Sequence, residues 1–246
     1  MRVLVIHGFM HNSKIWKNFE SLLKNKYECV VDYLAMSGFD NNIRLPKGNS
    51  YLNSYTAELS RMLVRYSYDL IIAHSMGAYL MLKCMDFAMN SKIVFMSPMI
   101  GNINTRHLRR VLPLGLSSGN LLAKVNKRMY EEAVKRFTKL TVYGFKYSDE
   151  MVSNVMECDI KVSAEVMSEL LKAGVPEFKL GKAGNCLFLY GNEDRILHAS
   201  KIMSYANKNH IRSIIFNNVG HCPFLEKPTE VMEEIDEFLR GERRWK

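Results

Sequence analysis

LIIAHSMGA, residues 70–78, leads an apolar run into a serine that has a small residue two places before it and another two places after it. The small residues are Ala73 and Gly77, and the run that follows at residues 79–83 is compatible with a helix. A serine at a tight strand-to-helix turn requires small neighbours at these positions, because the backbone is crowded there. The pattern predicts that Ser75 is a nucleophile at the start of a helix, where free N–H groups favour negative charge.

Five further short runs have the apolar, β-branched and aromatic character of buried parallel strands. Together with residues 70–73, the predicted strands are residues 3–6, 29–34, 93–96, 186–190 and 213–216. Helical periodicity separates several of them, and Ile15, Phe19 and Leu23 fall on one helix face. Strands that alternate with helices imply right-handed crossovers, so we expect an α/β fold with a doubly wound sheet.

The alternation is interrupted between residues 99 and 185, where the sequence has helical patterns and no convincing strand. Apolar residues recur there every three or four positions: Leu122, Val125, Met129, Ala133, Phe137, Val152, Val155, Met156, Val166, Leu170 and Leu171. We therefore expect residues 99–185 to form a helical cap inserted after the fourth strand. The core would then consist of residues 1–98 and 186–246.

Composition excludes several classes of protein. The chain has 246 residues, of which 48% are hydrophobic, as is usual for a globular domain. No apolar run approaches the roughly 20 residues needed to span a bilayer, and the first run stops at His7, which is too short for a secretion signal. Its five cysteines form no CxxC pair, which argues against a disulfide framework or a zinc site. We expect a cytoplasmic protein without a membrane span.

The net charge of +9 is concentrated in one part of the chain. Residues 106–146 contain ten Lys or Arg against two acids, Glu131 and Glu132. Such a stretch attracts anionic ligands, although a solvated helix surface explains the charge equally well. No nucleic-acid-binding motif accompanies it. An anionic substrate is therefore compatible with the sequence, whereas nucleic acid is not an expected partner, and nothing indicates the oligomeric state.

A serine nucleophile needs a base and an orienting carboxylate. His221 lies in NVGHCPF, residues 218–224, directly after the last predicted strand. It is therefore expected at the carboxyl edge of the sheet, where sites collect in open α/β folds. Asp194 follows the fifth strand and is the expected acid, with the adjacent Glu193 as the alternative.

A loop after the first strand, with the sequence HGFM at residues 7–10, is the candidate oxyanion site. Gly8 allows unusual backbone angles and a close approach to a ligand. We expect the backbone N–H groups of Phe9 and Met76 to bind the oxyanion. His7 is expected to hold this loop by hydrogen bonding. His74 is expected to pack or to form hydrogen bonds, because adjacent strand residues point to opposite faces.

On these residues the chain resembles the α/β-hydrolase superfamily, and in particular its small members with a helical cap. These members include carboxylesterases, proline iminopeptidase-like enzymes and C–C bond hydrolases. The resemblance covers nearly the whole chain, in residues 7–9, 32–39, 73–77, 191–194 and 220–228. It departs at Ala35 and Ala73, where glycine is usual. It implies a minimal fold of about six mostly parallel strands, because the chain begins at the strand before His7.

The resemblance also implies a chemistry, since Ser75, Asp194 and His221 occur in the order that such hydrolases use. We expect hydrolysis of a small-molecule ester by this triad, without a metal or organic cofactor. C–C bond hydrolysis, thioesterase or aminopeptidase activity on the same triad stays open. So does a non-catalytic binding protein on a hydrolase scaffold. Apolar residues of the insertion suit an acyl pocket, but core packing explains them equally well.

Overall fold

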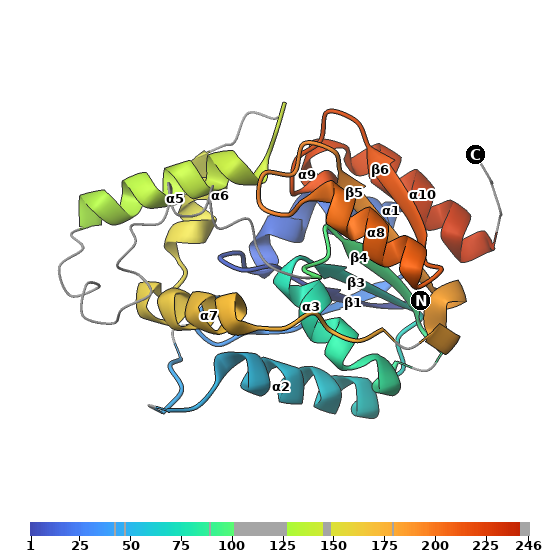
Figure 1. Ribbon diagram of the computed structural model, residues 1–246, viewed down its shortest axis with the longest axis horizontal. Helices are drawn as coiled ribbons and strands as arrows, with labels where there is room; N and C mark the ends of the chain where they lie inside the picture. The colour runs from blue at the N-terminus through green and yellow to red at the C-terminus, as the bar shows by residue number, and fades with distance from the viewer. Residues whose placement is uncertain are drawn as a thin grey trace.

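The computed structural model describes residues 1–41, 43–46, 48–88, 90–100, 127–144, 149–178 and 180–241. Its described part contains a six-stranded sheet in the order β2-β1-β3-β4-β5-β6, in which every neighbouring pair is parallel (Figure 1). The strands are β1 (Arg2–Ile6), β2 (Val30–Tyr33), β3 (Leu70–His74), β4 (Lys92–Met96), β5 (Cys186–Gly191) and β6 (Arg212–Phe216). All six predicted strands are present, and none of their ends differs by more than one residue from the prediction.

Helices cover both faces of the sheet, as a doubly wound fold requires. The first face packs against α2 (Tyr51–Arg65), α3 (Met76–Lys83) and α8 (Ala199–Lys208). The second packs against α1 (Lys17–Lys26), α9 (Pro223–Glu226) and α10 (Pro228–Arg240). Successive residues of β1 contribute to the two faces in turn, because side chains alternate along a strand.

The ends of several helices follow from local sequence. The short helix η1 (Ser13–Trp16) begins at Asn12, whose side chain accepts a hydrogen bond from the backbone N–H of Lys14 at 3.1 Å. Helix α10 (Pro228–Arg240) begins with a proline and is followed by Gly241, which has a φ of 72°. Proline in the first turn and glycine just after the end are both favoured at these positions. Two more short helices are η2 (Met85–Phe87) and η4 (Leu180–Asn185).

The insertion between β4 and β5 is helical where the structure describes it. It contains α5 (Lys127–Thr141), α6 (Asp149–Met156) and α7 (Ile160–Lys172), which Figure 1 shows to the left of the sheet. Helix α6 packs against α5 and η1, and α7 packs against α2. The predicted positions Leu122 and Val125 lie outside the described residues, as does much of the basic stretch 106–146. The division of the chain into a core and a cap stays a prediction.

None of the described helices combines the length and the apolar character that crossing a bilayer requires.

A buried aromatic stack joins the start of the chain to its C-terminal part. The ring of Trp16 lies against that of Phe224, with ring centroids 3.8 Å apart and an interplanar angle of 12°. Both side chains are almost completely buried, and Phe19 packs edge-on against each of them. Since Phe224 lies three residues after His221, this stack supports the loop that carries the histidine.

Replacing Trp16 should therefore destabilise the whole fold. We expect Trp16→Ala to lower the free energy of unfolding by about 3–5 kcal/mol, because it empties a closely packed site. Urea denaturation at neutral pH measures this change. The control is Val64→Ala on α2, where the side chain is 72% exposed and a loss within about 0.5 kcal/mol is expected. Equal losses in the two variants would contradict the role of the stack.

Candidate active site

The turn between β3 and α3 holds Ser75 in a strained conformation. Its backbone has a φ of 53° and a ψ of −113°, in a region that residues other than glycine rarely adopt. The N–H of Ser75 donates a hydrogen bond to the carbonyl of Met96 at the end of β4, at 3.0 Å. A Cβ atom on Gly77 would lie 2.5 Å from the carbonyl oxygen of Ile6. The small residue expected at this position is therefore a steric necessity.

Three of the predicted site residues form a continuous chain of hydrogen bonds. The Nε2 atom of His221 lies 2.9 Å from the Oγ atom of Ser75. Its Nδ1 atom lies 2.7 Å from the Oδ2 atom of Asp194. Since a carboxylate only accepts, Nδ1 carries a proton and Nε2 is the nitrogen that faces the serine hydroxyl. This arrangement can move a proton from Ser75 to His221.

Asp194 is fixed in place by its own turn. Its Oδ1 atom accepts hydrogen bonds from the backbone N–H groups of Ile196 and Leu197, both at 2.8 Å. Its side chain is fully buried, and that of His221 is 4% exposed. The neighbouring Glu193 uses its backbone N–H to bond the carbonyl of Val219. The acid that contacts the histidine is thus Asp194, whereas the alternative Glu193 has no described contact with it.

Two backbone N–H groups beside Ser75 are available to bind an anion. Neither Phe9 nor Met76 donates its N–H to an acceptor among the described residues. A Cβ atom on Gly8 would lie 2.8 Å from the Nδ1 atom of His74 and 3.1 Å from the Cβ of Ser75. Glycine at position 8 therefore allows the loop to approach the serine closely, as an oxyanion site requires.

His74 forms a hydrogen bond with the loop that carries His221. Its Nε2 atom donates a hydrogen bond to the backbone carbonyl of His221 at 2.9 Å. Burial, and next the charges of His221 and His11, hold the pKa of His74 well below its usual value. It is therefore neutral at physiological pH. This confirms the expectation that His74 packs and forms hydrogen bonds.

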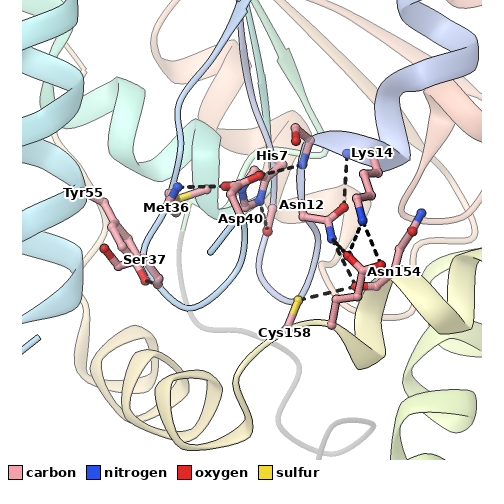
Figure 2. A network of polar contacts seen from close by, with 12 residues as sticks. His7, Asn12, Lys14, Met36, Ser37, Asp40, Tyr55, Asn154 and Cys158 are labelled. Carbon is pink, nitrogen blue, oxygen red and sulfur yellow. Dashed lines mark hydrogen bonds and ion pairs between the residues drawn. The ribbon is translucent and has the colours of Figure 1, made fainter. Parts of the chain in front are cut away.

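Asp40 is a positioning residue that sequence reasoning missed. Its Oδ2 atom accepts from the Nε2 atom of His7 and from the N–H of Met36, both at 2.8 Å (Figure 2). Its Oδ1 atom accepts from the N–H of Ser13 at 2.9 Å. His7 and Ser13 bracket the loop that contains Phe9, so one carboxylate ties both ends of that loop. The expected role of His7 in holding the loop is confirmed.

Burial alone would raise the pKa of the Asp40 carboxyl group. The hydrogen bonds and charge of His7, with the N–H groups of Met36 and Ser13, outweigh burial and lower this pKa to about 2. The carboxylate is therefore ionised at neutral pH. Asp40 has no motif of its own, and only the neighbouring resemblance at residues 32–39 pointed toward this loop.

A second partly buried carboxylate, Glu226, holds the loop that carries the histidine. Its Oε1 atom accepts from the N–H of Gly220 at 2.9 Å, and its Oε2 atom accepts from the N–H of Tyr143 at 2.8 Å. The N–H of His221 itself donates to the carbonyl of Thr141, the last residue of α5, at 2.9 Å. Burial raises the pKa of Glu226, and these N–H groups only partly offset it. The insertion thus contacts the histidine loop directly.

A small, mostly apolar cavity adjoins Ser75. It measures about 20 Å³, which is room for about one water molecule. The residues that line it are Phe9, His11, Ser75, Met76, Met99, Phe137, Met167, Leu170, Ile196, Leu197 and His221. Ligand pockets usually measure about 300–1,000 Å³. A ligand of that size would fit only if some of these side chains moved, and four of them belong to the insertion: Met99, Phe137, Met167 and Leu170.

Within the described ranges, no three His, Cys, Asp or Glu side chains come together in a way that could hold a metal ion.

The chain resembles known proteins in its family sequence pattern and in its structure. A sequence model described as "Alpha/beta hydrolase family" matches residues 3–234. No curated protein sequence matches the chain. The solved structures that resemble it confirm the fold class predicted from the sequence.

Three of these structures illustrate the likeness. An esterase from Exiguobacterium antarcticum is 13% identical with a TM-score of 0.68, and the match covers 98% of this chain and 92% of that one. The carboxylesterase CesB from Bacillus subtilis is 15% identical with a TM-score of 0.66, covering 98% and 84%. MenH from S. aureus is 18% identical with a TM-score of 0.68, covering 99% and 95%. At such identities the likeness concerns the fold.

The lowered pKa of Asp40 gives a prediction for stability against pH. A carboxyl group with a pKa of about 2 in the folded state and an ordinary value near 4 when unfolded stabilises the fold above pH 4. This contribution disappears as the pH falls from about 4 to about 2. We expect Asp40→Asn to lose about 2 kcal/mol of unfolding free energy at pH 7, and progressively less below pH 4.

Urea denaturation of the wild type and of Asp40→Asn between pH 7 and pH 3 tests this expectation. The control is Asp32→Asn, which removes a partly exposed ion pair with Arg2 and should cost about 0–1 kcal/mol. A difference between wild type and Asp40→Asn that stays constant over this pH range would contradict the assigned charge state.

Proposed function

The chain belongs to the α/β-hydrolase family, and from this premise we propose that it is a serine hydrolase that cleaves a small-molecule carboxylic ester. Ser75 is the proposed nucleophile, His221 the base and Asp194 the orienting acid. The observation that carries this proposal is the unbroken chain of hydrogen bonds at 2.9 and 2.7 Å from Ser75 through His221 to Asp194. It supports acyl transfer because the same chain is what activates a serine hydroxyl.

In the proposed acylation step, the Oγ atom of Ser75 attacks the ester carbonyl carbon while His221 takes its proton at Nε2. Asp194 stabilises the resulting imidazolium. The oxyanion is bound by the N–H groups of Phe9 and Met76, each worth roughly 3–4 kcal/mol in the transition state. His221 then gives the proton to the departing alkoxide, which leaves as an alcohol.

Deacylation reverses these roles with water. His221 removes a proton from a water molecule, whose oxygen attacks the acyl-enzyme carbonyl. Collapse of this second tetrahedral intermediate breaks the bond to Ser75, and the serine oxygen regains the proton from His221. One ester and one water thus yield one alcohol and one carboxylic acid. His221 relays the proton in every step of this scheme.

The lining of the cavity supports a short apolar acyl group as the substrate. Phe9, Phe137 and Met167 surround the space next to Ser75, and the cavity is small. Apolar contacts of this kind bind an aliphatic chain by its burial from water. The methionine side chain is flexible enough to adapt to chains of different shape.

The triad is tested by substitution. We expect Ser75→Ala to abolish labelling by a fluorophosphonate probe and to lower the kcat for p-nitrophenyl butyrate by at least about 10⁴-fold. Asp194→Asn should lower it by about 10³–10⁴-fold, because the imidazole then takes the wrong tautomer. The control is Glu193→Gln, whose kcat should stay within about twofold of wild type.

A Ser75→Ala variant that kept its activity would overturn the proposal. Activity on a vinylogous diketone, with none on the ester, would favour a C–C bond hydrolase.

The size of the acyl pocket is tested with a series of p-nitrophenyl esters from acetate to decanoate. We expect the wild-type kcat/KM to be highest for chains of two to four carbons. Met167→Ala should raise the ratio of octanoate to butyrate activity by at least about threefold, since it removes volume from the pocket. Leu171→Ala on the same helix, where the side chain is 43% exposed, should leave the ratio unchanged. If the two variants behave alike, Met167 does not limit the acyl chain.

A further inference from the structure

His11 is a buried polar residue in the active-site pocket that the triad does not use. It lies in the loop after β1, two residues beyond Phe9, and lines the cavity together with Ser75 and His221. Its side chain is almost completely buried. Among the described residues, neither ring nitrogen has a hydrogen-bond partner, and Nδ1 is fully buried.

The ring of His11 is held in one orientation by its surroundings. It stacks on the ring of His74, with centroids 5.6 Å apart and an angle of 16°. The backbone N–H of His11 donates to the carbonyl of Gly8 at 3.3 Å. The next residue, Asn12, donates from its side chain to the carbonyl of Asn154 and to Glu157 (Figure 2). The position of the ring is thus set by packing and by the loop backbone.

Electrostatics define which kind of ligand His11 can bind. Burial, followed by the charges of His221 and His7, lowers the pKa of His11 to about 3. The ring is therefore neutral at physiological pH and offers one N–H donor and one lone pair. No Lys, Arg, Asp or Glu is present among the described residues that line the cavity.

An unpaired polar group in such a pocket is unusual. Buried polar atoms in folded proteins nearly always have a hydrogen-bond partner, because desolvation without one is costly. A ligand that supplies the partner would remove this cost. A charged ligand group would meet no counter-ion here, and burying a charge without one is far more costly. The missing partner is therefore an uncharged group.

We propose that His11 is a specificity-determining residue, which hydrogen-bonds an uncharged hydroxyl or carbonyl group on the acyl part of the substrate. The pocket would then select acyl chains that are apolar except for one such group near the scissile ester. The inference deepens the proposed esterase function and rests on it.

The experiment compares four esters: p-nitrophenyl butyrate and its 2-hydroxy, 3-hydroxy and 3-oxo derivatives. The measured quantity is the ratio of kcat/KM for each derivative to kcat/KM for butyrate. His11→Phe keeps an aromatic ring against His74 and removes both nitrogens. His11→Leu is the second variant, in case the first does not fold as judged by circular dichroism. His198→Phe, at an exposed histidine outside the pocket, is the matched control.

We expect at least one derivative to exceed butyrate by about fivefold or more with the wild type. The same ratio should fall about five- to tenfold in His11→Phe and His11→Leu, as the loss of one neutral hydrogen bond implies. It should be unchanged in His198→Phe. A role in packing alone would alter activity on all four esters in parallel and leave the ratios as they are.

Two negative results can be told apart. The role of His11 would be overturned if the wild type hydrolysed butyrate but preferred no derivative. It would also be overturned if the ratios did not change in the His11 variants. Either result would leave the esterase function standing. Wild type that hydrolyses none of the four esters and resists the fluorophosphonate probe would overturn the esterase function, and this inference with it.

Discussion

The close approach of α3 to the end of β1 is the constraint on which the site depends. Gly77 lies so near the carbonyl oxygens of Ile6 and His7 that a Cβ atom would be only 2.5–2.6 Å from them. A helix that begins this close to the neighbouring strand forces a sharp turn at Ser75, whose φ of 53° is strained. The loop after β1 also approaches the serine closely, since a Cβ atom on Gly8 would lie 3.1 Å from the Cβ of Ser75. These two close approaches position the candidate nucleophile and the candidate oxyanion site.

The two loops that flank the serine are held by partly buried carboxylates outside the triad. Asp40 accepts hydrogen bonds from both ends of the loop after β1, and Glu226 accepts from the backbone just before His221. A loop has no ladder of backbone hydrogen bonds to fix it, and an ionised acceptor can replace that ladder with short, directional contacts. The pKa values of the two carboxyl groups shift in opposite directions. The pKa of Asp40 is lowered by its hydrogen-bond partners, whereas burial raises the pKa of Glu226. The stack of Trp16 on Phe224 adds apolar packing to the histidine loop.

The sequence predicted the strands well because a parallel strand buried on both faces must be apolar throughout. It was least accurate at β2, an edge strand whose first residue, Val30, is 62% exposed. Ser75, Asp194 and His221 could be located because each directly follows a strand, and carboxyl ends of parallel strands meet at one edge. Asp40 and His11 could not be assigned this way. Asp40 acts on His7, 33 residues away, and the unpaired state of His11 depends on everything packed around it. Long-range partners of this kind leave no periodic pattern in a sequence.

The insertion contributes to the site in two physically different ways, which restricts how a substrate can enter. The end of α5 bonds the histidine loop through the carbonyl of Thr141 and the N–H of Tyr143, whereas α7 places Met167 and Leu170 in the cavity. If the whole insertion swung away, His221 would lose the acceptor of its backbone N–H. The start of α7 is also tied to the core, because the N–H of Asp159 donates to the carbonyl of Gly38. A rigid movement of α5 would therefore break its hydrogen bonds with the histidine loop, whereas α7 reaches the cavity only through the side chains of Met167 and Leu170. Rotation of these two side chains would enlarge the cavity of about 20 Å³ and leave the hydrogen bonds of the triad intact.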